Sequence, residues 1–147
     1  MRASKTLAAL AMAAILGGCA SSVPLQQGQV GAITRDAAPA QIDQALGQAT
    51  VVAQYEFKER EGHYTARHCN LQTGTQQQMT MVCTPTCIPI FITVPVLTEY
   101  VVIQSLPERK VHAWGTLEEL SKDADPSVSG LMPTVKQRLA DAKAAKK

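Results

Sequence analysis

The sequence lacks several features that would point to a familiar chemistry. It has no glycine-rich phosphate loop, no internal repeat at the periods of solenoid proteins, and no nucleophile motif around its three histidines. Its apolar runs are too short to cross a bilayer as a helix, which takes about 20 residues. We therefore expect neither catalysis nor a bound cofactor or metal ion.

The N-terminus has the pattern of an export signal. Arg2 and Lys5 precede an apolar run over residues 7–16, which is long enough for a signal-peptide core. The run ends in Leu16-Gly17-Gly18-Cys19, which resembles the lipobox of bacterial lipoproteins. The resemblance implies cleavage between Gly18 and Cys19, with residues 1–18 removed and a diacylglycerol attached to the Cys19 thiol.

The residues after Cys19 predict the membrane that the protein reaches. In Gram-negative lipoproteins of this kind, an aspartate at this place retains the protein in the inner membrane. Here the neighbours are Ala20, Ser21 and Ser22, so the resemblance implies the outer membrane, with the domain facing the periplasm. Two or three acyl chains would make this anchoring effectively permanent.

Removal of the signal also changes the charge balance. The chain carries 14 basic and 12 acidic residues. Loss of Arg2 and Lys5 makes the two numbers equal. A neutral chain in the periplasm gives no reason to expect nucleic-acid binding.

The remaining chain is long enough for one small domain with a single core. We predict a flexible tether over residues 19–35, because this stretch is small and polar. Residues 36–131 form the predicted domain, and residues 132–147 a C-terminal helix or tail, exposed and frayed. The first helix begins near Asp36 or Ala38, with Pro39 in its first turn, and stops at Gly47.

The pattern after this helix is that of extended strands. Strands are predicted over residues 51–57, 63–71, 79–83, 99–106 and 111–114, with turns at residues 73–75 and 107–110. Thr116 and Glu119 have the spacing of a capping box for a short helix to Lys122. The order predicts an α+β fold, a small antiparallel sheet with short helices packed on one face, as a two-layer sandwich.

Residues 88–97 are β-branched and apolar at every even position and include Pro89 and Pro95. Because these prolines are an even number of residues apart, their missing N–H groups fall on one edge of a strand. The other edge stays free to pair, as in a proline-bearing edge strand. An irregular or polyproline-like segment over the core is the alternative.

One short motif resembles a known family. Residues 40–48, Ala-Gln-Ile-Asp-Gln-Ala-Leu-Gly-Gln, look like a helix end of the small outer-membrane lipoproteins of the BamE/SmpA type. The strands and the closing hairpin follow in the corresponding order, over about half of the mature chain. Ala49 replaces the usual proline, and residues 73–97 have no counterpart. The resemblance implies an accessory subunit of an envelope complex that inserts β-barrel proteins.

Three cysteines remain after lipidation of Cys19. In an oxidising compartment Cys69, Cys83 and Cys87 allow at most one internal disulfide. Cys69 could pair with Cys83 across a hairpin centred near Gln76, and Cys83 could instead pair with Cys87 across Thr-Pro-Thr.

Cys83 and Cys87 also allow a second hypothesis. The stretch Cys83-Thr-Pro-Thr-Cys87-Ile-Pro89 is similar to the cysteine motif of copper-delivery proteins, and thiolates suit Cu(I). Any nitrogen ligand would come from His63, His68 or His112. The sequence thus leaves a non-catalytic envelope interaction protein, or a copper- or thiol-handling lipoprotein. Lys146 and Lys147 add a weaker hypothesis of linkage to peptidoglycan.

Overall fold

Residues 23–47 and 49–146 are described by a computed structural model. Gly18, Cys19 and Lys147 therefore lie outside the described residues. Four antiparallel strands form one sheet in the order β1 (Val51–Glu59), β2 (Gly62–Cys83), β3 (Cys87–Ser105) and β4 (Lys110–Thr116). The predicted α+β fold, with a small antiparallel sheet and short helices, is confirmed.

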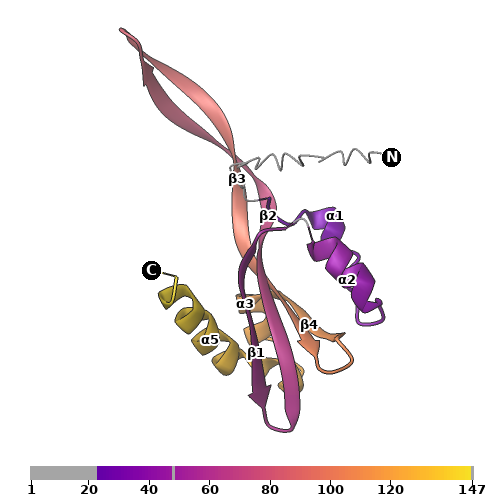
Figure 1. The fold of residues 1–147 in the computed structure, drawn as a ribbon. Helices are drawn as coiled ribbons and strands as arrows, with labels where there is room; N and C mark the ends of the chain where they lie inside the picture. Colours follow the sequence, from indigo (N-terminus) through magenta and orange to yellow (C-terminus); the bar gives the residue numbers. More distant parts are fainter. Residues whose placement is uncertain (1–22, 48, 147) are drawn as a thin grey trace, which may run out of the picture.

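The helices lie on both faces of this sheet, not on one as predicted (Figure 1). The helices are α1 (Gln27–Val30), α2 (Pro39–Leu46), α3 (Leu117–Ser121), α4 (Pro126–Ser129) and α5 (Met132–Ala144). On one face, Ile42 and Leu46 of α2 pack on Tyr100 and Val102. On the other, helices α3 to α5 pack on Val101 and its neighbours. Successive β3 side chains alternate between the faces, so an unbroken apolar run needs a cover on each side.

The N-terminal segment belongs to the folded domain from Val23 onward. Leu25 is fully buried, and Ile33 is 1% exposed. The Leu25 N–H donates to the Asn70 carbonyl, and the Gln72 N–H donates to the Leu25 carbonyl, at 2.7 and 2.9 Å. The expected tether is therefore wrong over residues 23–35, because two isolated apolar side chains in a polar stretch reach the core.

Local sequence signals mark several helix and hairpin ends correctly. Pro39 is in the first turn of α2, and Gly47 follows its end. The Glu119 N–H donates to the Thr116 hydroxyl at 3.2 Å, and the Thr116 N–H donates to the Glu119 carboxylate at 2.8 Å. The predicted capping box is thus confirmed, and these hydrogen bonds hold the pKa of Glu119 below its usual value.

The C-terminal helix α5 is part of the core rather than an exposed tail. Met132, Val135 and Leu139 are all buried. They recur at helical spacing, so one side of α5 covers the sheet.

The hairpin of β2 and β3 turns later than expected. Residues 73–75 do not form a turn, because β2 runs through them with a bulge between Gln72 and Gly74 and continues to Cys83. Residues 88–97 pair with β2 and with no other described strand. They form the predicted edge strand, not the irregular alternative.

Candidate interaction site

The far half of the β2–β3 hairpin projects from the rest of the fold (Figure 1). β1 pairs with β2 only as far as Cys69, and β4 pairs with β3 only as far as Tyr100. From Gly74 to Val96 the two strands contact each other alone among the described strands. We call residues 74–96 the arm.

The arm carries most of the exposed apolar surface of the described chain. Its exposed large hydrophobic residues reach 70% exposure at Phe91 and 61% at Met79 and Ile88. The others in the arm are Met81, Val82, Ile90, Ile92 and Val96. Outside the arm, only Val23, Val51 and the adjoining Leu97 belong to this class among the described residues. A contiguous exposed apolar surface of this kind marks an interaction site.

The strand register divides the arm into two faces. Gln78 pairs with Ile92 and Thr80 with Ile90, so even-numbered residues of both strands share one face. That face carries what we call the aliphatic stripe, namely Ile88, Ile90, Ile92, Val94 and Val96. On the other face, Met79 and Met81 lie opposite Phe91 and Pro89 near the tip.

Charged residues are missing from the arm and its base. The chain has no Asp, Glu, Lys or Arg between Arg67 and Glu99. An exposed ribbon without charge lacks one common protection of soluble sheet edges, namely charged side chains. This gap in the charge pattern is the sequence signal from which the arm could have been recognised.

The tip of the arm carries a disulfide between Cys83 and Cys87. Both cysteines are exposed, whereas Cys69 is a free, buried thiol in the body of the fold. Pairing of Cys69 with Cys83 does not occur, because the hairpin turns at residues 84–86 and places Tyr100 opposite Cys69. Burial raises the pKa of the Cys69 thiol, which keeps it protonated and unreactive.

The three histidines lie in the body, away from the cysteines at the tip. His63 pairs with Glu56 at 3.3 Å, and the His112 ring nitrogen is 3.3 Å from the Ser127 carbonyl. His68 is fully buried. Within residues 23–47 and 49–146, no group of three His, Cys, Asp or Glu side chains could hold a metal ion.

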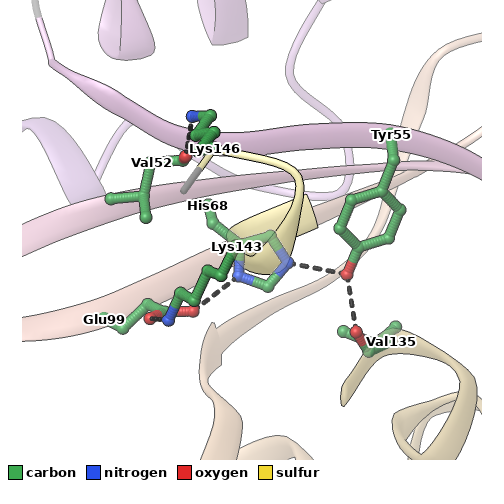
Figure 2. Close-up of polar contacts among 7 residues, drawn as sticks. All are labelled: Val52, Tyr55, His68, Glu99, Val135, Lys143 and Lys146. Atoms are coloured by element: carbon green, nitrogen blue, oxygen red, sulfur yellow. Dashed lines mark hydrogen bonds and ion pairs between the residues drawn. The ribbon is translucent and has the colours of Figure 1, made fainter. Parts of the chain in front are cut away.

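His68 belongs to a polar network that joins three strands to α5 (Figure 2). One ring nitrogen is 2.8 Å from the Tyr55 hydroxyl, and the other is 3.0 Å from the Glu99 carboxylate. The Tyr55 hydroxyl also donates to the Val135 carbonyl at 2.8 Å, and Lys143 donates to Glu99 at 2.6 Å. Burial lowers the pKa of His68, and the neighbouring Glu99 opposes that shift only in part.

The chemistry of the network fits a structural role, in which it links the strands to α5. A neutral His68 donates from Nδ1 to Glu99, and its Nε2 shares the single proton of the Tyr55 hydroxyl with the Val135 carbonyl. Burial raises the pKa of Tyr55, so its hydroxyl keeps its proton. The His68 ring has no exposed surface from which to reach a substrate.

Asp43, which has no recognisable partner in the sequence, has two in the fold. Its carboxylate accepts from Arg109 at 2.9 and 3.0 Å and from Arg67 at 3.2 Å. Arg109 is in the β3–β4 turn with a φ of 58°. These ion pairs hold α2 against the sheet. The charges of Asp43, Arg67 and Arg109 thus pair with one another, and they need no bound ligand to account for them.

No family model, no curated protein and no solved structure matches this chain. No helix within the described part of the chain is both long and apolar enough to cross a membrane.

Proposed function

We propose that the protein is a non-catalytic, lipid-anchored subunit at the periplasmic face of the outer membrane. It acts there by binding other envelope proteins. The proposal rests chiefly on the arm, because its apolar side chains are exposed and no other part of the described chain covers them. A two-stranded ribbon is marginally stable in water by itself, and a binding partner would remove its apolar side chains from solvent.

The N-terminal pattern supports the location in the envelope. Lipidation of Cys19 would hold the arm close to one membrane surface at high local concentration. The similarity of residues 40–48 to BamE/SmpA-type lipoproteins favours an accessory role in outer-membrane protein assembly. Linkage of Lys147 to peptidoglycan would be a second attachment to the same compartment.

The experiment is co-purification of the full-length protein from detergent-solubilised outer membranes, with identification of retained proteins by mass spectrometry. Phe91→Ser and Ile90→Ser should each reduce retention of the partner at least tenfold. Val51→Ser is the matched control, because Val51 is exposed on the body. Equal retention by all variants would rule out the arm as the binding element.

Lipidation is tested by labelling cells with a radioactive fatty acid. We expect label on the wild-type protein and none on Cys19→Ala, which should also leave the membrane fraction. A wild-type protein without label would remove the anchoring part of the proposal.

The exposed cysteine pair at the tip favours one second candidate, a thiol- or copper-handling lipoprotein. Cys83 and Cys87 are accessible to a reductant, although the disulfide form offers no thiolate. Thiol titration and a copper assay on the purified protein separate the two functions. One disulfide, one buried thiol and no copper would exclude thiol or copper handling and leave the interaction subunit as the remaining proposal.

A further inference from the structure

The arm has two open edges, and the hydrogen bonds at its base show which backbone groups face them. Leu25 bonds to the backbone of Asn70 and Gln72 from the side of β2 opposite to β3. Backbone groups alternate in direction along a strand, so Leu71 faces β3 and pairs there with Thr98. Even-numbered residues of β3 therefore face β2, and odd-numbered ones face the open edge.

This alternation places both prolines of β3 on its open edge. Pro89 and Pro95 are odd-numbered, so the positions that lack an N–H are those that would pair with an added strand. The sequence predicts that the opposite edge of β3, where no N–H is missing, stays free to pair. In the fold that edge is already paired with β2. Strand addition to residues 88–97 is therefore blocked on one side and filled on the other.

The open edge of β2 carries no such block. The register across the bulge pairs Gly74 with the inward-facing Val96, so the outward-facing residues are those opposite the odd positions of β3. These residues are Thr75, Gln77, Met79 and Met81. None is proline and none is charged, so each keeps an N–H and a carbonyl for pairing.

A bilayer is a poor environment for this edge. Lipid offers no hydrogen-bonding groups, so unpaired backbone donors at a sheet edge do not occur within hydrocarbon. The face with the aliphatic stripe also carries Gln76, Gln78 and Thr80 from β2. A protein strand can pair with the edge, and a lipid chain cannot.

A second copy of this chain fits the edge. In a two-fold antiparallel pairing along residues 75–81, Gln77 of one copy lies opposite Met79 of the other, and residues near the axis lie close to their own counterparts. A charge in this short segment would therefore lie close to a like charge. The arm contains none. A pairing through one open edge also ends at two copies when the opposite edge is blocked.

We propose that two copies of the protein pair antiparallel through the β2 edges of their arms, along residues 75–81. The product is a continuous four-stranded sheet in which Pro89 and Pro95 of each copy close the outer edges. The aliphatic stripes of both copies stay on one face, free for an envelope partner. The inference rests on the proposed function in that shared anchoring in one membrane concentrates the copies.

The test compares two prolines placed directly opposite each other. Gln77 and Thr93 are cross-strand neighbours whose N–H groups both point outward, so neither Gln77→Pro nor Thr93→Pro removes a β2–β3 hydrogen bond. Sedimentation of the full-length protein in detergent should give a dimer for the wild type and Thr93→Pro. It should give a monomer for Gln77→Pro. A monomeric wild type, or equal behaviour of the two variants, would overturn the proposal.

A lysine pair repeats the comparison without backbone strain. Gln77→Lys should weaken dimerisation at least tenfold at low salt, because each copy brings a positive charge to the shared edge. Thr93→Lys should not. Equal dissociation constants for these two variants would contradict the edge assignment even if the proline variants fail to fold.

Release of the blocked edge gives the opposite effect. The double variant Pro89→Thr/Pro95→Thr restores two donors and should form assemblies larger than a dimer. A double variant that stays dimeric would show that the prolines do not limit assembly. Loss of dimerisation with an envelope partner still retained would overturn this inference alone, whereas an intact dimer that retains no partner would overturn the proposed function.

Discussion

The two long strands are buried at one end and exposed at the other, although both ends are apolar. Tyr100 to Ile103 are at most 4% exposed, whereas Ile90 and Ile92 in the same strand are 39% exposed. Both halves share one hydrogen-bonded ladder with β2. The difference lies in the neighbours, because only the buried half has β1, β4 and a helical layer on each face. Hydropathy alone therefore does not separate a core strand from an interaction strand.

The strongest test of this comparison truncates isoleucine in each half. Ile103→Ala should lower the free energy of unfolding by about 3 kcal/mol, because the methyl groups leave a cavity in a packed core. Ile92→Ala should change it by less than about 0.5 kcal/mol, because Ile92 is exposed and belongs to neither buried cluster. Urea denaturation of both variants gives the two values. Similar losses would mean that the arm is covered in solution.

A smaller loss of stability is expected when the His68 network in the buried half is disrupted. Tyr55→Phe removes the hydroxyl between His68 and Val135 and leaves a buried ring nitrogen unpaired. We expect a loss of about 1–2 kcal/mol in the same assay. Tyr64→Phe is the control, since the Tyr64 hydroxyl makes no side-chain hydrogen bond among the described residues. An unchanged free energy of unfolding in Tyr55→Phe would mean that the network does not stabilise the fold.

The α3 cap provides a local test of the same contrast. Thr116→Ala removes the hydroxyl that accepts the Glu119 N–H and should cost about 1 kcal/mol. Thr93→Ala in the arm should be neutral. Thermal unfolding followed by circular dichroism separates the variants, and equal midpoints would contradict a stabilising cap.

The body should also lose stability in acid, while the uncharged arm contributes nothing to this dependence. The folded-state pKa of His68 is below its ordinary value of 6.5 because the ring is buried. As pH falls through 6.5, His68 of the unfolded chain binds a proton that His68 of the folded chain does not yet bind. The free energy of unfolding therefore decreases as pH falls from 7.5 to 5.5. Urea midpoints at these two values measure the fall. His68→Gln should reduce it, whereas His112→Gln, which alters a half-buried ring, should leave it unchanged.

The smallest effect on the body is expected from the tip disulfide. The double variant Cys83→Ser/Cys87→Ser opens a short loop in a region that no described helix contacts, so the midpoint for core unfolding should stay within about 0.5 kcal/mol of the wild type. Amide exchange in the arm should accelerate, because the ribbon loses its covalent end. Unchanged arm exchange would mean that the ribbon is held by its own packing or by a partner.

Much of the fold could be predicted from short-range patterns. The capping box at Thr116, the proline at the start of α2 and the β3–β4 turn each involve residues within a few positions of one another. Their interactions form regardless of what surrounds them. Alternation likewise places both prolines of residues 88–97 on one strand edge, because proline removes a donor wherever it stands. The irregular alternative is excluded only by the pairing of these residues with β2.

Other features depend on contacts between residues far apart in the sequence. Leu25 and Ile33 look like part of a polar tether until the sheet offers them a core. Residues 73–75 contain turn formers, yet the pairing of β2 with β3 on both sides of them makes Gly74 a bulge. The network around His68 joins residues from four elements, so no local pattern could show it.

The sequence by itself determined the extended character of residues 51–57, 63–71 and 99–106, the ends of α2 and the start of α3. It also determined that both prolines fall on one strand edge and that the arm carries no charge. Each of these is a property of single residues or of near neighbours. The tertiary structure decided which half of the hairpin is covered, which edge of the arm is open and which cysteines are joined. These depend on where the chain turns and on what packs against it, and the free energies involved come from contacts that no segment makes alone.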